Sequence, residues 1–348
     1  MERKRLVFKS LILTLFFLLI FFLITLFGLG IWGFFQWHSF SKAAGVSLPE
    51  FKNIVQTGLS TNITQTDGHK NILLLGTDSL KTRGDIPPLT DSLMLISLNL
   101  QSGQINTLSL PRDLWNAKYQ TRINALYTYG QETLAAEAIA DMTDLPIHHV
   151  LVLSMEQVAE MIDLLGGVEI TVPVAFKDEQ FPREEVDVTV EHDPAKLYKT
   201  IEFKAGKQIM SGQTALEYMR SRKSGDDEGT DIARGSRQQL VMEAVIAKLK
   251  QRSILLNARL MGQLFAYYKN NFAKNLSVEE LIAVACQLSQ FENLKFEIKN
   301  YSLEVFPDQP EGAIYHPNPK LYQNQWLYVI KNQADFTNFI KNKLYAKQ

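Results

Sequence analysis

The sequence contains little cysteine and no excess of basic residues. Cys286 is the single cysteine among 348 residues, so the chain cannot close an intrachain disulfide or build a cysteine-rich zinc or iron–sulfur site. Lys and Arg number 36 against 37 Asp and Glu, which argues against a general nucleic-acid-binding protein. The His-Glu-x-x-His, Gly-x-Ser-x-Gly and Walker-type motifs are also absent. We therefore expect no nucleic-acid partner and none of the hydrolase or nucleotide-binding chemistry that these motifs carry.

One long run without charge lies near the N-terminus. Residues 10–37 contain no Asp, Glu, Lys or Arg, and about 20 apolar residues suffice to cross a bilayer. Four basic residues precede this run and only Lys42 follows it closely, so we expect residues 1–9 in the cytoplasm and the rest outside. A cleaved signal peptide is the competing interpretation, but its apolar region is usually only ~7–15 residues long. The sequence thus predicts a single-pass protein of the plasma membrane, with an extracytoplasmic catalytic domain.

The outer part of the chain is mildly acidic. The whole chain has a net charge of −1, and its first 42 residues carry +4. The remaining residues therefore carry −5. Residues 38–67 are rich in small polar side chains and are predicted to form a stalk. We expect a domain over residues 68–330 and a C-terminal tail, partly helical, over 331–348. Any tight arginine cluster in such an acidic domain is informative, because general basicity does not explain it.

Short apolar runs alternate with amphipathic segments through the domain. Strands are predicted at residues 71–76, 92–99, 104–110, 149–153, 168–172 and 294–305. Helices are predicted at residues 155–165, 213–219, 231–252 and 277–290, two of them opened by capping boxes at Ser154 and Ser277. The polar residues 173–200 are expected to form a surface excursion. The pattern favours an α/β fold with a central β-sheet covered by helices on both faces, preceded by one transmembrane helix.

A first group of charged residues lies at predicted strand ends. Asp78 follows the first strand, Asp91 precedes the second, and Arg112 and Asp113 follow the third. Open α/β sheets bind ligands at such an edge, so these side chains could form a polar site. The simpler alternative is that each is a solvated loop charge or a helix cap.

A second group surrounds the start of a predicted helix. Arg220 and Arg222 end one helix, and Asp231 opens the next, which carries Arg234, Arg237 and Gln238 in its first two turns. Cations are unfavourable at a helix N-terminus unless an anion is bound there, so this cluster indicates a phosphate site. Ion pairs with the acidic residues 226–228 are the alternative.

The same residues lie in segments that resemble a known family. These segments are NILLLGTDS (71–79), TDSLMLISLN (90–99), LSLPRDL (108–114), RINALYTYG (122–130), LLGGVEITV (164–172), ALEYMRSR (215–222) and DIARGSRQQ (231–239). Together they are similar to the LytR-CpsA-Psr family, also called the cell envelope-related transcriptional attenuator domain. Members of this family are membrane-anchored enzymes that transfer glycopolymers from a polyprenyl-pyrophosphate carrier to peptidoglycan, assisted by Mg²⁺.

The resemblance implies a role for each matching residue. Asp78 and Asp91 would hold Mg²⁺ or Mn²⁺, and the pyrophosphate would be bound by Arg112, Arg220, Arg222, Arg234 and Gln238, with Arg237 beside them on the same helix. Thr90 stands where the family often has Arg, and Arg83 in the preceding loop is the substitute cation that we expect. Arg122 replaces a frequent Lys. The base that assists the incoming hydroxyl stays open between Asp78, Asp91 and Asp231.

Two other functions are alternatives to a transferase. A pyrophosphatase would attack the same lipid with water through the same residues. A non-enzymatic envelope regulator or adhesin would need the topology but not the acid and arginine groups. The expected partners are a polyprenyl-pyrophosphate-linked glycan, a peptidoglycan acceptor and the plasma membrane.

Overall fold

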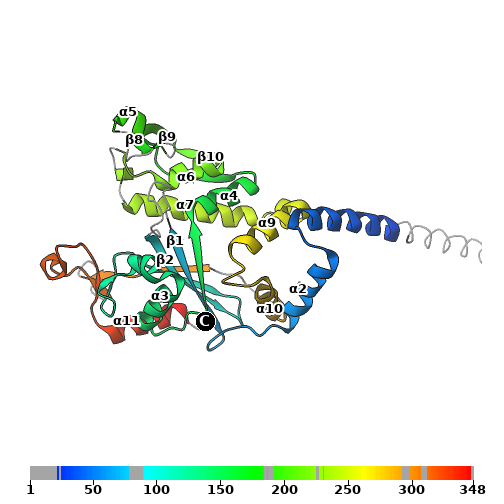
Figure 1. Cartoon of the computed structure of the whole chain (residues 1–348), viewed down its shortest axis with the longest axis horizontal. Coiled ribbons are helices and arrows are strands. Elements are labelled where there is room, and N and C mark those ends of the chain that lie inside the picture. Colours follow the sequence, from blue (N-terminus) through cyan, green and yellow to red (C-terminus); the bar gives the residue numbers. More distant parts are fainter. Residues whose placement is uncertain are drawn as a thin grey trace, which may run out of the picture.

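Two lobes lie one above the other in the computed structural model (Figure 1). The structure describes residues 22, 25–77, 89–183, 186, 192–224, 227–229, 231–291, 298–306 and 312–345. One lobe contains a five-stranded sheet and the other contains helices with two small sheets. Each lobe has its own cluster of buried apolar residues. The mixed α/β class that the sequence predicts is therefore correct.

The large sheet has the strand order β11-β3-β2-β1-β6. Its strands are β1 (His69–Thr77), β2 (Thr90–Asn99), β3 (Ile105–Leu110), β6 (His149–Ser154) and β11 (Ile298–Ser302). The first three strands form an antiparallel meander, while β6 runs parallel to β1 and β11 parallel to β3. The strands predicted at 92–99 and 104–110 are confirmed and form a hairpin, in whose turn Gly103 adopts φ 74°, a value that glycine adopts without strain.

One face of this sheet is buried under helices α3 (Leu126–Thr143) and α11 (Gln333–Leu344). Strand side chains alternate between faces, so the same face carries Leu73, Leu75, Leu93, Leu95, Leu108 and Leu110, all buried. Helix α11 contributes Phe336, Ile340 and Leu344 to this core, each no more than 1% exposed. The C-terminal tail at 331–348 that the sequence predicts to be partly helical thus contains α11, and this helix packs into the core of the domain.

The opposite face of the sheet is less covered. Helix α10 (Val278–Ser289) packs over the end of β2 through Leu98, Val284 and Leu288. Further along the strands, five apolar side chains are partly exposed and belong to none of the three apolar clusters of described residues, namely Ile72, Leu74, Met94, Ile96 and Leu151. Strand pairing places them side by side, since Leu74 pairs with both Met94 and Leu151. The expected cover of helices is thus incomplete on this face.

The second lobe follows β6 in the chain. It consists of α4 (Met155–Leu164), β7 (Val168–Val172), β8 (Phe176–Pro182), α5 (Pro194–Leu197), β9 (Tyr198–Phe203), β10 (Gly206–Met210), α6 (Gly212–Arg220) and α7 (Asp231–Leu249). Ser154 caps α4 with both hydrogen bonds of a capping box, as predicted. Strand β7 pairs with β10 in a separate small sheet. The expected surface excursion at 173–200 is wrong, because β8 and β9 form a hairpin that buries Phe176, Asp178 and Phe181.

Short elements complete the fold. They are β4 (Trp115–Asn116), β5 (Thr121–Arg122), α8 (Arg252–Leu255), β12 (Val305–Phe306), β13 (Ile314–Tyr315), β14 (Val329–Ile330) and the 3-10 helices Ile123–Ala125, Asp227–Gly229 and Pro319–Tyr322. Of the predicted strand at 294–305, residues 294–297 lie outside the described residues, and the rest is found as β11 and the start of β12, with residues 303 and 304 outside regular structure.

The segment between the N-terminal helix and β1 is docked on the domain. Residues 25–44 are helical, and α2 (Leu48–Ser60) packs against α10, where Gly58 faces Ile282 at a distance that leaves no room for a Cβ atom. Phe40 stacks edge-on against Phe265 of α9 (Ala258–Asn271), with ring centroids 5.9 Å apart. Residues 38–67 therefore do not form the free stalk that the polar composition predicts.

Half of the predicted transmembrane run lies outside the described residues, namely residues 10–21, 23 and 24. Within the described part of the chain, no helix combines the length and the apolar character needed to cross a bilayer.

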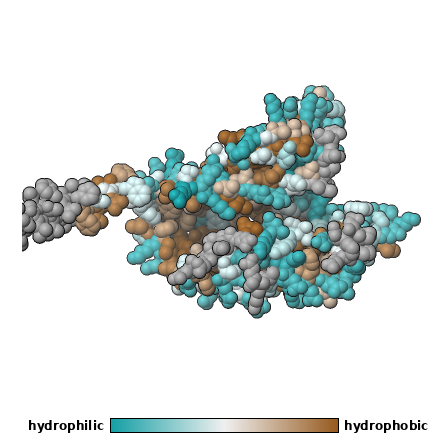
Figure 2. All heavy atoms as spheres, turned by 180° about the vertical axis from the view of Figure 1, so that it is seen from behind, coloured by the Kyte–Doolittle hydropathy of each residue, from teal (hydrophilic) through white to brown (hydrophobic). Residues whose placement is uncertain are grey.

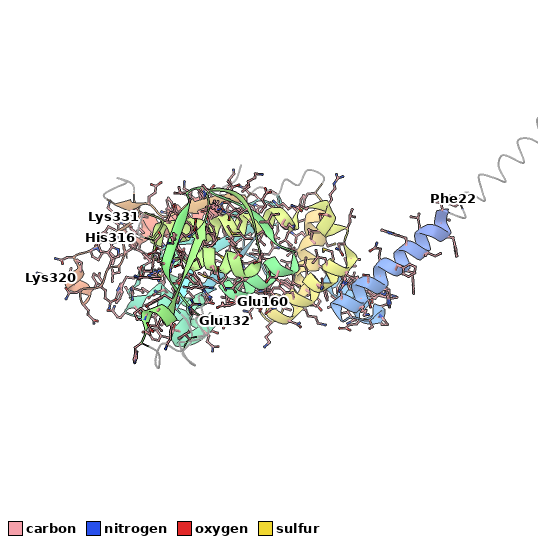
Figure 3. All side chains as sticks on the ribbon, turned by 90° about the horizontal axis from the view of Figure 1, so that it is seen from above. Phe22, Glu132, Glu160, His316, Lys320 and Lys331 are labelled. Atoms are coloured by element: carbon pink, nitrogen blue, oxygen red, sulfur yellow. The ribbon has the colours of Figure 1, made fainter. Side chains whose placement is uncertain are left out.

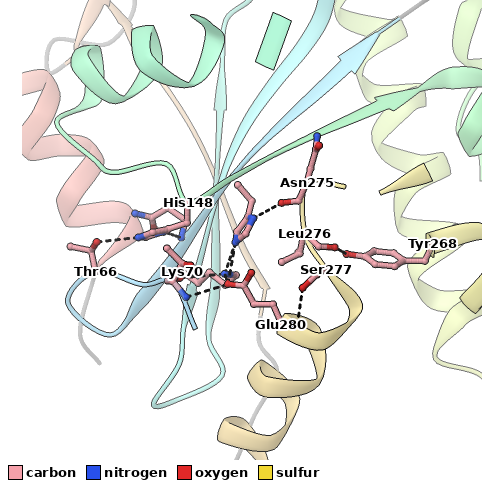
Figure 4. Close-up of polar contacts among 11 residues, drawn as sticks. Thr66, Lys70, His148, Tyr268, Asn275, Leu276, Ser277 and Glu280 are labelled. Atoms are coloured by element: carbon pink, nitrogen blue, oxygen red, sulfur yellow. Dashed lines mark hydrogen bonds and ion pairs between the residues drawn. The ribbon is translucent and has the colours of Figure 1, made fainter. Parts of the chain in front are cut away.

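A buried polar network joins α10 to the sheet (Figure 4). Lys70 of β1 is 1% exposed and forms an ion pair with Glu280, and it donates a hydrogen bond of 2.8 Å to Nε2 of His149 on β6. Ser277 caps α10 by accepting from the backbone N–H of Glu280. The carboxylate of Glu280 turns to Lys70, so the predicted capping box is half formed.

Candidate functional site

Charged residues from both lobes converge on Asp91. Asp91 is the second residue of β2, and its Oδ1 accepts a hydrogen bond of 2.7 Å from Nη1 of Arg112, which follows β3. Its Oδ2 lies 3.9 Å from Nη1 of Arg234 on α7. The Arg234 side chain is 6% exposed. The two groups of residues that the sequence places on separate elements thus meet at one edge of the sheet.

A row of alternating acidic and basic side chains continues along the loop after β3. Arg112 Nε lies 3.4 Å from Oδ2 of Asp113, whose Oδ1 accepts a bond of 2.9 Å from Arg122. Each carboxylate therefore holds two guanidinium groups within 4 Å. An arginine has five donors, so pairing with a carboxylate fixes the orientation of its guanidinium group.

Arg220 lies at the C-terminal end of α6 and is buried. Its guanidinium forms an ion pair with Glu156 in the first turn of α4, a residue that the sequence analysis did not identify. Arg222 is exposed on the loop that follows. This loop is fixed by Asp178, whose Oδ2 accepts from the hydroxyl of Ser221 and from the backbone N–H of Arg222. Asp178 is 1% exposed and has a structural role that its polar sequence context concealed.

Arg237 differs from the other arginines. Its guanidinium donates to the carbonyls of Tyr218, Ser221 and Glu228, and to the carboxylate of Glu228 at 2.9 Å. Its side chain is 2% exposed and lies over the ring of Phe176. Four of its five donors are used by the protein, so the predicted contact with pyrophosphate conflicts with its geometry. Here the alternative of an ion pair with the acidic loop is correct.

Gln238, the residue after Arg237, has a half-buried side chain whose amide nitrogen lacks a hydrogen-bond partner among the described residues. This atom, Nε2, is buried. A buried amide without a partner costs about 1–3 kcal/mol, so this group is suited to a ligand that brings an acceptor. The observation agrees with the phosphate role that the resemblance implies.

Asn124 shows the same feature and was not predicted. It is 3% exposed, and its Oδ1 has no hydrogen-bond partner within the described part of the chain. Its backbone N–H donates to the carbonyl of Arg112, and its carbonyl accepts from the hydroxyl of Thr90. Asn124 therefore links the two strands' ends that carry Asp91 and Arg112. Its place in the segment RINALYTYG is the sequence signal that could have identified it.

Three predicted residues cannot be placed. Asp78 and Arg83 lie outside the described residues, as does the side chain of Asp231, the first residue of α7. The neighbours of the two predicted metal ligands are described, however. Thr77, before Asp78, pairs with Thr90, before Asp91, across β1 and β2.

The donor set is compatible with a divalent cation shared with phosphate. No group of three His, Cys, Asp or Glu side chains that could hold a metal ion exists among the described residues. Mg²⁺ commonly uses one or two carboxylates together with phosphate oxygens and water, and Asp91 offers such a carboxylate beside two guanidinium groups. The site therefore fits Mg²⁺ as a ligand-shared ion and not as a closed protein site.

Fold and site together give a two-lobed α/β domain with arginines from both lobes gathered at one edge of its main sheet. The chain belongs to the LytR_cpsA_psr family, whose sequence profile matches residues 38–331. This confirms the resemblance drawn from the sequence segments.

Named relatives agree with this assignment. The chain is 27% identical over 280 residues to the polyisoprenyl-teichoic acid–peptidoglycan teichoic acid transferase TagU of Bacillus cereus, which covers 79% of this chain and 78% of that protein. It is 24% identical over 286 residues to TagU of Bacillus licheniformis, covering 80% and 82%. The crystal structure of B. subtilis TagV shares the fold, with a TM-score of 0.51, 20% identity, and coverage of 82% of this chain and all of that one.

Proposed function

We propose that this protein is a phosphotransferase that moves a glycopolymer from a polyprenyl-pyrophosphate carrier to peptidoglycan. Its relatives are named as transferases of teichoic acid from a polyisoprenyl carrier to peptidoglycan. The observation that carries the proposal is the convergence of Arg112 and Arg234 on Asp91, with Arg220 paired to Glu156 on the neighbouring helix α4. Two buried guanidinium groups, of Arg220 and Arg234, beside the partly exposed one of Arg112 suit a diphosphate.

The proposed reaction exchanges one phosphorus–oxygen bond for another. A hydroxyl oxygen of the acceptor attacks the phosphorus that carries the glycan, and the bond from this phosphorus to the bridging oxygen breaks. Prenyl phosphate leaves with the bonding electrons, and the hydroxyl proton passes to a carboxylate. Negative charge grows on the leaving phosphate, so fixed guanidinium groups lower the barrier.

The arginines would act as a preformed clamp. Arg112 and Arg234 are already oriented by Asp91, so their N–H groups need little reorganisation when phosphate oxygens arrive. Gln238 Nε2, buried and without a partner among the described residues, would donate to the same ligand. Arg222 is exposed and would contact the glycan side of the diphosphate or its phosphate oxygens at the entrance.

A metal ion is part of the proposal. Mg²⁺ or Mn²⁺, held by Asp91 together with Asp78, would supply positive charge to the phosphate oxygens when bound. The base stays open between Asp78, Asp91 and Asp231. Because Asp91 already accepts from Arg112, its described geometry favours an orienting role over proton transfer.

The prenyl chain needs an apolar surface near the arginines. The partly exposed sheet face of Ile72, Leu74, Met94, Ile96 and Leu151 offers one. Seen from behind, hydrophobic atoms gather in the hollow between the two lobes, beside the root of the N-terminal helix (Figure 2). We propose that these apolar surfaces receive the lipid, and that residues 10–37 anchor the chain in the plasma membrane with the domain outside.

Product analysis tests the proposal. The full chain in detergent is incubated with a polyprenyl-pyrophosphate-linked glycan and Mg²⁺, with and without a soluble peptidoglycan acceptor, and the products are identified by mass spectrometry. A transferase gives a phosphodiester-linked glycan that requires the acceptor. Equal release of lipid phosphate without acceptor would identify a pyrophosphatase instead. No change in the lipid would favour a non-enzymatic regulator or adhesin.

A further inference from the structure

A second, acidic cleft lies beside the arginine site. It has a volume of about 450 Å³ and lies at the carboxyl ends of β1 and β6, between α3, α4 and the end of α9. Its lining includes Tyr127, Glu132, Glu156, Gln157, Glu160 and Asn271. Glu132 and Glu160 lie near each other on α3 and α4 (Figure 3). The size is within the ~300–1,000 Å³ range of small-ligand sites.

The wall of the cleft is held by hydrogen bonds that fix its amide groups. Gln157 Nε2 donates to Oδ1 of Asn271 at 3.1 Å, while Gln157 Oε1 accepts from the backbone N–H of Ser154. Asn275, another lining residue, donates to the carbonyl of Val150 on β6. The end of α9 is thereby tied to α4 and to the edge strand of the sheet. A wall fixed in this way does not depend on a ligand for its shape.

The charge of the lining disfavours a phosphate ligand. Among the lining residues, Glu132 and Glu160 face a single cation, Lys274, while the charge of Glu156 is balanced by Arg220, so the cleft disfavours the anionic group that the arginines attract. Glu132 is partly buried and forms no ion pair or hydrogen bond with the described residues. Burial and the nearby Glu132 charge raise the pKa of Tyr127, which keeps its hydroxyl as a donor. Carboxylates, amides and a hydroxyl beside the rings of Tyr127 and Phe272 suit a neutral ligand rich in hydroxyl and amide groups.

The cleft is continuous with the arginine site through two residues. Glu156 lines the cleft and forms the ion pair with Arg220. Thr77 lines it as well, and it immediately precedes Asp78 in the chain. A ligand in the cleft therefore has one end next to the proposed diphosphate. This is the position that an attacking hydroxyl must occupy.

We propose that this cleft binds the acceptor glycan, with Glu132 and Glu160 accepting hydrogen bonds from its hydroxyl or amide groups. The inference rests on the proposed function, because it assigns the second substrate of that reaction. The two substrates are sorted by charge: the arginine side takes the diphosphate donor and the acidic side takes the neutral sugar. The carboxylates contribute more to acceptor binding than to donor binding.

The test separates binding of the acceptor from binding of the donor. The probe is a soluble, lipid-free oligosaccharide of alternating N-acetylglucosamine and N-acetylmuramic acid whose lactyl carboxyl groups are amidated, so that it carries no charge. Its affinity for the full chain is measured by saturation-transfer NMR, and its KM by the transfer assay. Glu132→Gln with Glu160→Gln keeps the shape of both side chains and removes their charge. Glu137→Gln, on the exposed side of the same helix α3, is the matched control.

The double variant should raise the acceptor KM and weaken NMR binding at least tenfold, with donor affinity within twofold of the parent, while the control changes neither. Thermal melts check that the variants fold. An unchanged acceptor KM in an active double variant would overturn the cleft assignment and leave the transferase function standing. Glycan binding that depends on Glu132 and Glu160, in a parent without transfer activity, would support the cleft and refute the function. Absence of glycan binding by the parent would overturn the inference.

Discussion

Removing one partner of the buried Lys70–Glu280 ion pair should strongly destabilise the fold. The side chains of Lys70 and Glu280 are 2% and 10% exposed, so Glu280→Gln leaves an ammonium group buried without an anion. Removing one partner of a buried pair costs about 3–5 kcal/mol. Lys70 keeps acceptors in His149 and in the carbonyl of Thr64, which offset about 1 kcal/mol, so we expect a loss near the lower limit. A loss of about 3 kcal/mol corresponds to roughly 6–12 °C in Tm.

A double variant isolates the pair interaction. Lys70→Met with Glu280→Leu removes both charges. Its destabilisation should therefore be smaller, by about 1–3 kcal/mol, than the sum of the losses caused by Lys70→Met alone and Glu280→Leu alone. The assay is thermal unfolding of the full chain in detergent, followed by circular dichroism. Glu169→Gln is the matched control, because Glu169 pairs with Lys207 at 2.9 Å on the surface and its loss should leave Tm unchanged. A Tm of Glu280→Gln within 2 °C of the parent would refute the reasoning.

Further predictions concern the site, its supports and pH. Arg234→Lys should lower donor turnover at least tenfold with little change in Tm, since lysine cannot hold two phosphate oxygens in a fork; the transfer assay and a melt measure both. Asp178→Ala removes acceptors from the loop that carries Arg222 and should cost about 2–3 kcal/mol in denaturant titration. Burial raises the pKa of Glu280, but Lys70 and His149 together outweigh it and hold this pKa below its ordinary 4.5. The folded state therefore binds fewer protons than the unfolded state near this pH. The stability that Glu280 contributes is present above pH 4.5 and should be lost as the pH falls further. Unfolding midpoints measured between pH 7 and pH 3 check this. Gln131→Gly should raise Tm, because Gln131 adopts φ 52° and ψ −148° inside α3, where a side chain is strained.

Local signals in the sequence were sufficient for the elements whose stability is local. The Ser154 capping box and the Gly166-Gly167 end define α4, and the structure shows both, with φ of 73° and 92° at the glycines. Alternating apolar residues and the Ser102-Gly103 turn define the β2–β3 hairpin. These features depend on residues within a few positions of each other, which is why they could be read from the sequence.

Features that depend on distant partners were not predicted. Asp178 looks like a solvated loop charge until the loop after α6 places three donors around it, 43 to 45 residues away. Glu280 matched a capping box, but its carboxylate is taken by Lys70, 210 residues away. The polar composition of 38–67 indicated a linker, since the apolar contacts of Phe40 and Gly58 are made with α9 and α10, late in the chain.

The candidate site was predicted in composition and only partly in geometry. Resemblance identified Asp91, Arg112, Arg220 and Arg234, and the structure describes all four near the joint between the lobes. Helical position alone could not separate Arg234 from Arg237, three residues later. The difference arises because Arg237 meets the carbonyls of Tyr218 and Ser221, whereas Arg234 meets the carboxylate of Asp91.

The docking of residues 38–60 on the domain makes this segment a rigid support instead of a flexible linker. A flexible linker of about 30 residues would have a root-mean-square span of roughly 30 Å and would let an attached domain sample many heights and tilts. Here the contacts of Phe40 with Phe265 and of Gly58 with Ile282 fix the direction in which the N-terminal helix leaves the domain. If residues 10–37 span the bilayer as we propose, the arginine site is held at one distance from the lipid headgroups. Shortening or lengthening the polar segment would then tilt the domain instead of changing its reach.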